Sequence, residues 1–144
     1  MLDIIAVAAV MLHSFGRMGC FFAGCCYGLL TDGSLYLEFT NKLSQAPLNE
    51  HLHPTQLYSV TLLLSIMVIL LMFKRHKRFS GQLFLIYIIL YAIGRSVIEI
   101  FRGDEERGYI IQDLLTNSQF ISILLIAVVI CYYTRLSKST KADL

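Results

Sequence analysis

Long apolar runs separated by short polar segments form the pattern of this chain. We expect four of these runs to be helices that cross a membrane, because each approaches the roughly 20 residues that a hydrocarbon core of about 30 Å requires. The second run, QLYSVTLLLSIMVILLMF, contains no charge and is the clearest, whereas the fourth is slightly short. The predicted spans are residues 2–22, 56–73, 82–101 and 119–133. The pattern therefore predicts an all-α membrane protein.

The segments between the predicted spans differ in character. A long loop, residues 23–55, joins the first two spans, and its SLYLEFT stretch alternates as a short strand or hairpin does. The acidic segment 102–117, RGDEERGYIIQDLLTN, is compatible with a short amphipathic helix. We expect residues 1–134 to form a single transmembrane domain and residues 135–144 to form a tail.

Basic residues are distributed unevenly among these segments, and their distribution predicts an orientation. The KRHKR segment after the second span holds four Lys or Arg and the tail holds three, whereas the other two loops together hold three. Because Lys and Arg are enriched in cytoplasmic loops, we expect the KRHKR segment, the N-terminus and the tail to be cytoplasmic. The long loop between the first and second spans is then an outer loop.

Composition supports the same class of protein. Hydrophobic residues make up 56% of the 144 residues and charged residues 15%, against roughly 25% charged in a typical soluble domain. The start of the chain carries Asp3 where a cleavable signal peptide would be basic, so we expect no such peptide. Neither a cofactor nor a nucleic-acid partner is expected.

Two ionisable residues in the third predicted span are the strongest functional signal. Arg95 and Glu99 are four residues apart and share one helical face, which Tyr91 and Arg102 extend. A charge at the centre of a span costs about 2.5–3.5 kcal/mol on the insertion scale. One interpretation is a structural ion pair near the outer end of the span. The other, which we favour, is an outward-facing polar cavity that binds an anionic group.

The first predicted span repeats this arrangement. His13 and Arg17 are also four residues apart, and Arg17 opens the glycine-rich stretch GRMGCFFAGCCYG. Glycines permit close backbone approach or a broken helix, although small residues also serve plain helix packing. An arginine in such a place is well suited to a phosphate, which it can bind through two parallel hydrogen bonds.

The cysteines suggest a metal site that their spacing does not support. Cys20, Cys25 and Cys26 could join His13, but C-x4-C-C lacks the C-x2-C spacing of structural zinc sites and no second cluster completes four ligands. We therefore expect no metal site, and a disulfide between Cys20 and Cys25 is an alternative. Cys131, in the fourth span, is expected to be a buried small apolar residue.

The second span opens with HPTQLYS. Pro54 suits the first turn of a helix, and Thr55 or His53 is a candidate cap. This structural interpretation explains the proline fully, but it explains Gln56 and Tyr58 less fully.

Taken together, the motifs resemble those of the prolipoprotein diacylglyceryl transferase family. The strings FGRMGCFFAGCCYG, HPTQLYS, YAIGRSVIEIFRGDEE and NSQFISI follow one another in the order found there, across residues 3–122. The resemblance implies a mostly helical, multi-pass enzyme of the bacterial inner membrane, with a site open to the periplasm and the membrane. Such enzymes move diacylglycerol from phosphatidylglycerol to the lipobox cysteine of a prolipoprotein signal peptide and release glycerol phosphate.

Carried over by position, the resemblance implies catalytic roles for Arg17, Arg95 and Glu99. The chemistry agrees, since a phosphate needs cations, an attacking thiol needs a base and a departing glycerol phosphate needs charge stabilisation. The residues assigned to substrate binding are His13, Gly28, His53, Gln56, Tyr58, Tyr91 and Arg102.

Two departures from the family pattern shape the expected function. Well-known members carry Asn and Glu at the positions that match Cys20 and Cys25, and they carry a His-Gly-Gly segment in earlier spans that this chain does not contain. The chain resembles the C-terminal half, so we expect a truncated or split transferase that needs a separate chain for the missing spans. The alternative is a non-catalytic phospholipid-binding membrane protein or partner subunit. A small channel or transporter would leave HPTQLY unexplained.

Overall fold

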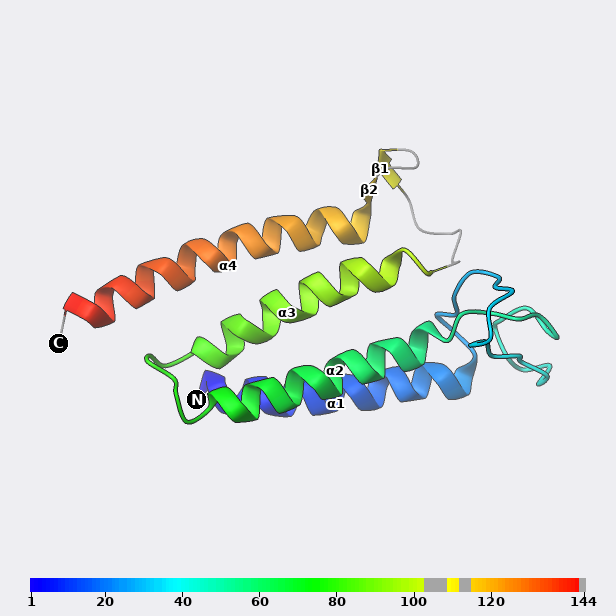
Figure 1. Cartoon of the computed structure of the whole chain (residues 1–144), viewed down its shortest axis with the longest axis horizontal. Coiled ribbons are helices and arrows are strands. Elements are labelled where there is room, and N and C mark those ends of the chain that lie inside the picture. Colours follow the sequence, from blue (N-terminus) through cyan, green and yellow to red (C-terminus); the bar gives the residue numbers. More distant parts are fainter. Residues whose placement is uncertain (103–108, 112–114, 143–144) are drawn as a thin grey trace.

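The computed structural model is built from helices that run roughly along one long axis (Figure 1). It describes residues 1–102, 109–111 and 115–142, and the side chains of residues 1–102 and 119–135. Within these ranges the helices are α1 (Leu2–Ala23), α2 (Thr55–Phe73), α3 (Gln82–Glu99) and α4 (Asn117–Ala142), and the strands are β1 (Tyr109–Ile111) and β2 (Leu115–Thr116).

Three of the helices, α1, α2 and α3, are long and apolar enough to cross a membrane. The apolar part of α4, Gln119–Arg135, is shorter. The predicted all-α class, with four helices and a long loop between the first two, is confirmed for the described residues. This agreement is expected, because an apolar run can satisfy its backbone polar groups inside a bilayer only by forming a helix or a closed barrel.

The two ends of the molecule are formed by different segments of the chain. The N-terminus, the connection between α2 and α3 and the end of α4 lie at one end, whereas the loop after α1 and the β1–β2 hairpin lie at the other (Figure 1). Helix α1 packs against α2 and α3, and α4 packs against α3. The residues that form the buried core between the first three helices are Ala6, Val10, Leu63, Ile66, Leu70 and Leu83.

Large apolar side chains cover the outside of the helices. On α1 alone, Ile4, Leu12 and Phe22 are 74%, 76% and 80% exposed. In water such a surface would be unfavourable by about 25 cal/mol per Å², whereas acyl chains or further spans can cover it at no such cost. The distribution of apolar residues is therefore that of a multi-pass membrane protein.

A buried carboxylate, whose structural role the sequence did not predict, joins the helix ends that we expect to face the cytoplasm. Asp3 is 6% exposed and accepts hydrogen bonds from the backbone N–H of Leu83 and from Nζ of Lys77, both at 3.0 Å. The backbone contact satisfies one of the N–H groups that the first turn of α3 leaves without a helical partner. Asp3 thereby fixes the start of α1 against the start of α3.

Helix α3 ends two residues earlier than the predicted third span. The backbone N–H groups of Ile100, Phe101 and Arg102 bond to carbonyls three residues back, so the chain tightens and leaves the helix. Arg102 then pairs with Gly28 in an isolated antiparallel bridge. The predicted polar face of this helix therefore runs from Tyr91 to Glu99. Arg102 lies beside that face because of the turn that follows the helix.

The predicted strand at SLYLEFT is present as single bridges instead of a regular hairpin. Leu37 exchanges backbone hydrogen bonds of 2.9 and 3.0 Å with Leu52, and Phe39 pairs with Leu48. The amphipathic helix expected in segment 102–117 does not form at residues 109–111 and 115–116, which pair as β1 and β2. Isoleucine, tyrosine and threonine favour a pleated strand there. The rest of that expectation lies outside the described residues.

Three segments of the chain meet at Gly28. Its backbone N–H bonds to the carbonyl of His53 at 3.1 Å, and the next residue, Leu29, bonds to the carbonyl of Phe101 at 2.9 Å. A Cβ at Gly28 would lie 2.6 Å from the first of these oxygens and 2.7 Å from the second. Only a residue without a side chain permits this approach, so Gly28 holds together the loop after α1, the entry to α2 and the exit of α3.

Replacing Gly28 by alanine should therefore destabilise the chain. The new methyl group has to displace backbone on two sides, and overpacking of this kind costs on the order of 1–3 kcal/mol. We expect Gly28→Ala to lower the midpoint of thermal unfolding, followed by circular dichroism in detergent micelles. Gly16→Ala is the matched control, because nothing lies within 4 Å of a Cβ there. Equal midpoints for the two variants would contradict the close approach at Gly28.

Candidate functional site

A buried ion pair lies at the exit end of α3. The guanidinium of Arg95 pairs with the carboxylate of Glu99 one helical turn later, and the two side chains are 10% and 4% exposed. The spacing of four residues produces this contact, as the sequence predicted. Burial of two charges is costly, and removing one partner would leave the other uncompensated.

Helix α1 presents its ionisable residues to two tyrosines of α3. Nη2 of Arg17 donates to the hydroxyl of Tyr91 at 3.3 Å, and Nδ1 of His13 lies 3.2 Å from the hydroxyl of Tyr87. The rings of His13 and Tyr91 are 4.7 Å apart. The His13 and Arg17 pair therefore contacts the α3 face that also carries Arg95 and Glu99, through Tyr87 and Tyr91.

Three guanidinium groups interact in this region. Arg95 is paired with Glu99, and it interacts electrostatically with Arg17 and Arg102 as well. Like charges repel strongly where water is excluded. An anionic ligand would reduce this repulsion, so the arrangement is suited to one.

A cluster of aromatic side chains lies close to the arginines, where three segments of the chain meet at Gly28. Nδ1 of His53 lies 3.4 Å from the hydroxyl of Tyr58, and the rings of both residues meet that of Phe101 edge to face, at 5.4 and 6.2 Å. Phe101 immediately precedes Arg102, and Gly28 bonds to His53. These sequence-distant residues are thus gathered beside the guanidinium groups.

The start of α2 holds the cysteine loop in place. Oγ1 of Thr55 donates to the carbonyl of Cys26 at 2.8 Å, and Nε2 of Gln56 donates to that of Cys25 at 2.9 Å. Neither Thr55 nor His53 caps α2, contrary to expectation, since no side chain caps the helix at its N-cap residue, Pro54. The hydroxyl of Thr55 is used by the loop instead. Oε1 of Gln56 is buried without a hydrogen-bond partner among the described residues.

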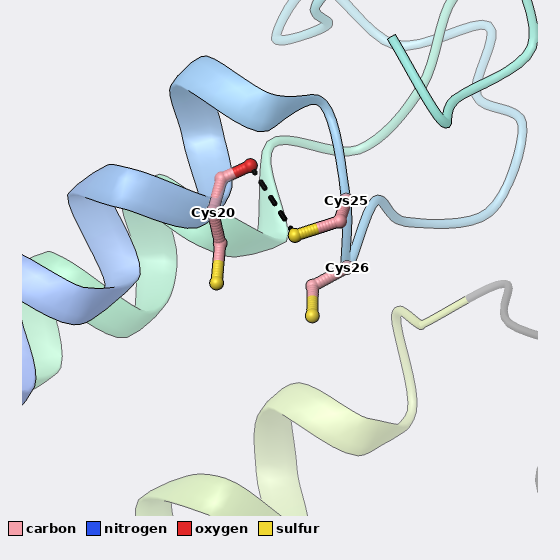
Figure 2. A group of neighbouring side chains, drawn as sticks. All are labelled: Cys20, Cys25 and Cys26. Atoms are coloured by element: carbon pink, nitrogen blue, oxygen red, sulfur yellow. Dashed lines mark hydrogen bonds between the residues drawn. The ribbon is translucent and has the colours of Figure 1, made fainter.

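Three cysteines converge where α1 ends (Figure 2). Cys20 lies in the last turn of α1, and the thiol of Cys25 donates to its carbonyl at 3.7 Å. Cys20, Cys25 and Cys26 are all free thiols here, so the alternative of a disulfide is not formed. Burial raises the pKa of the Cys25 thiol to about 11, and the neighbouring Cys20 and Cys26 act in the same direction. At neutral pH Cys25 is therefore protonated and is not a ready nucleophile.

Cys131 lies elsewhere, on α4. It is exposed, so the expectation of a buried apolar residue is wrong for this structure. The reason is that α4 packs against α3 on one side and leaves its other sides to the surroundings.

The structure brings most of the sequence-predicted site residues into one connected group. Arg17 bonds to Tyr91 and Arg95 pairs with Glu99, while Arg95 interacts electrostatically with Arg17 and Arg102. His13 joins them through Tyr91. His53 and Tyr58 adjoin through Gly28 and Phe101. Gln56 lies one step away, behind the cysteine loop.

Sequence analysis missed Tyr87 and Phe101, and it expected Thr55 only as a helix cap. Tyr87 precedes Tyr91 by one helical turn, so its position on the same face was a usable signal. Phe101 and Thr55 act through contacts with segments far away in the sequence, which no local pattern reveals.

The chain resembles one family of known proteins over most of its length. The family described as prolipoprotein diacylglyceryl transferase matches residues 1–135. A phosphatidylglycerol–prolipoprotein diacylglyceryl transferase of Clostridium tetani is 42% identical over 89% of this chain and 50% of its own length. A Clostridium perfringens relative, named as the second such transferase, is 36% identical over 86% of this chain and 47% of its own.

A more distant relative covers nearly the whole chain. A Dehalococcoides mccartyi protein of the same name is 32% identical over 99% of this chain and 54% of its own length. No solved structure gives a significant match. The chain thus spans about half the length of the curated relatives that it matches. By both the family match and these relatives, the chain belongs to the prolipoprotein diacylglyceryl transferase family.

Proposed function

We propose that this chain is the phospholipid-binding half of a membrane transferase that moves diacylglycerol from phosphatidylglycerol to the lipobox cysteine of a prolipoprotein. The observation that carries the proposal is that Arg95, which pairs with Glu99, also interacts electrostatically with Arg17 and Arg102. The names of the relatives supply the donor and the acceptor, which are both properties of proteins about twice as long.

The arginines suit the phosphodiester of phosphatidylglycerol in number and in chemistry. A guanidinium donates two parallel hydrogen bonds to a phosphate and stays charged when it is buried. Arg17 is oriented by Tyr91 and Arg95 by Glu99, so their side chains are fixed before the lipid arrives. Such preorganisation lowers the entropic cost of binding and directs positive charge to the atoms where negative charge develops.

The transfer itself places two demands on the site. The acceptor sulfur forms a bond to the terminal glycerol carbon of the diacylglyceryl group, while the bond from that carbon to the phosphate oxygen breaks. Glycerol phosphate leaves with the electron pair, which the arginines stabilise, and the thiol proton passes to a base. Glu99 is occupied by Arg95, and Cys25 stands where well-known members carry a carboxylate.

A base supplied by a separate polypeptide would complete the chemistry. We therefore propose that the chain acts as a split member of the family, with a second chain contributing the missing N-terminal spans. The exposed apolar face of α1, with Leu12 and Phe22, is where such spans could pack. Without that second chain, the same residues would make a phospholipid-binding membrane protein or partner subunit, and the occupation of Glu99 by Arg95 favours this second candidate.

Replacing an arginine of this group should weaken lipid binding. We expect Arg17→Ala to reduce the affinity for phosphatidylglycerol by roughly 10–100-fold, since a charge-assisted hydrogen bond contributes about 1.5–3 kcal/mol. Arg95→Ala should do the same and should also destabilise the chain, because Glu99 loses its partner. Arg95→Lys should restore stability more than affinity, since lysine lacks the forked geometry.

The measurement is binding of phosphatidylglycerol to purified chain in zwitterionic detergent micelles. Arg75→Ala is the matched control, because Arg75 is exposed in the KRHKR segment, apart from the group. Unchanged binding by a folded Arg17→Ala variant would reduce the arginines to a structural role.

The chain alone should release little glycerol phosphate in the presence of a lipobox peptide. General-base catalysis is typically worth 10²–10⁴-fold, so we expect turnover to rise by about that factor when the remaining half of the Clostridium tetani relative is supplied as a separate polypeptide. Robust release by the chain alone, abolished in Arg17→Ala, would instead show that these four helices carry the whole chemistry.

The orientation of the chain is a further part of the proposal. We infer that it lies in the bacterial inner membrane with the KRHKR segment and the C-terminal tail in the cytoplasm and with the site towards the outer face. Reporter fusions at Lys77 and Gln45 should then report opposite compartments. Fusions that report the same side would contradict the arrangement of spans.

A further inference from the structure

The three cysteines at the end of α1 take no part in the proposed transfer, yet their geometry is specific. The sulfur atoms of Cys20, Cys25 and Cys26 all lie within 4.8 Å of one another. Figure 2 shows the three side chains approaching a common space from the last turn of α1 and from the loop that follows it. Three sulfur atoms so close together are an unusual feature for a chain with four cysteines in total.

The backbone that produces this convergence is held against its own preference. Gly24 ends α1 in the left-handed conformation, and Cys26 also has a positive φ of 61°. For a residue with a side chain, the left-handed region costs roughly 1–2 kcal/mol. Such conformations persist where the surroundings fix them, and they are common at functional sites.

Two buried side chains of α2 supply that fixation. Thr55 and Gln56 are 2% and 1% exposed and donate hydrogen bonds to the carbonyls of Cys26 and Cys25. Both carbonyls are thereby turned towards α2. Hydrogen bonds from α2, which lies 29 and 31 residues away in the sequence, thus fix the backbone of the cysteine loop. The fixed backbone in turn sets the positions of the thiols.

We propose that Cys20, Cys25 and Cys26 together bind one Zn(II) ion as thiolates, and that their thiol protons are released to solvent when the ion binds. With Zn–S distances of about 2.3 Å, tetrahedral coordination places sulfur atoms roughly 3.8 Å apart. The sulfur atoms are already within 4.8 Å, so side-chain rotation alone can close the remaining difference. Three protein ligands leave a fourth position for water or another small ligand, which is a common zinc arrangement.

Charge and ligand type favour this ion. Soft thiolate ligands select zinc and copper(I) over magnesium, calcium and manganese. Three thiolates around Zn(II) carry one net negative charge, and Arg17 interacts electrostatically with Cys20 and Cys26. A cation beside the site offsets that charge. The cysteine spacing led us to expect no metal here, and the structure does not test that expectation. The C-x2-C spacing applies to ligands on one local turn, whereas these cysteines come from a helix end and the loop after it.

The inference is independent of the transferase proposal, because it concerns affinity for a metal and not lipid binding or turnover. A bound ion would join the last turn of α1 to the loop that leads to Gly28, and it would stabilise the folded chain by mass action. A chain that binds zinc but whose affinity for phosphatidylglycerol is unchanged by Arg17→Ala would support this inference and contradict the other.

The test is titration of the full chain, purified and reduced under nitrogen in detergent micelles, with Zn(II) alone against a chromophoric chelator. We expect one ion per chain and a raised midpoint of thermal unfolding. Co(II) in place of zinc should give sulfur-to-metal charge-transfer absorption, which reports thiolate ligands in the unaltered protein. Cys20→Ser and Cys25→Ser should each lower the affinity by about tenfold or more, since losing even an outer-shell partner commonly costs 10–100-fold.

Cys131→Ser is the matched control, because Cys131 is exposed on α4 and apart from the cluster. It should leave affinity and spectrum unchanged. Absence of charge-transfer absorption in the unaltered chain, or equal loss of affinity in Cys131→Ser, would overturn the proposal. So would isolation of the anaerobically purified chain with a disulfide among the three cysteines, because the site would then be a redox pair.

Discussion

Close backbone approach at Gly28 is the constraint on which the end of the molecule that holds the candidate site depends. The loop after α1 bonds there both to the entry of α2 and to the exit of α3, and the distances leave no room for a side chain. This junction pairs Arg102 with Gly28 and brings His53 against Phe101. Without it Arg102 would lose its fixed place beside the charged face of α3, and a flexible group of cations binds an anion weakly.

The second constraint is the cost of charge in an apolar environment. Arg95 and Glu99 offset each other, and Arg17 and Arg102 also interact electrostatically with Arg95. The tyrosines of α3 help, since Tyr91 and Tyr87 give Arg17 and His13 polar partners within the helix interface. Cations held close together in an apolar environment are costly, and an anionic ligand would lower that cost.

Two observations fit the proposal that further helices pack against this chain. Exposed residues such as Leu12 and Phe22 form a surface that lipid or other helices can cover, and the relatives are about twice as long as this chain. Gly16 and Gly19 also face outward, with nothing near them among the described residues. They therefore take no part in the packing of α1 against α2. Helix packing was one of the two explanations that the sequence offered for the glycines of this stretch.

The amino-acid sequence alone determined the helices and the charged pairs. Apolar runs of membrane length leave the backbone no alternative to a helix, and a spacing of four residues places Arg95 beside Glu99 on any helix. The motif order was likewise sufficient for the family, because FGRMGCFFAGCCYG, HPTQLYS and YAIGRSVIEIFRGDEE are linear features.

Tertiary structure alone decided which separate motifs meet. Thr55 holds the cysteine loop instead of capping its own helix, Arg102 leaves the α3 stripe to pair with Gly28, and Asp3 bonds to Leu83. Each contact joins residues that are far apart in the chain, so neither periodicity nor propensity contains it. The convergence of Cys20, Cys25 and Cys26 is of the same kind, because it depends on a strained loop that α2 stabilises from outside.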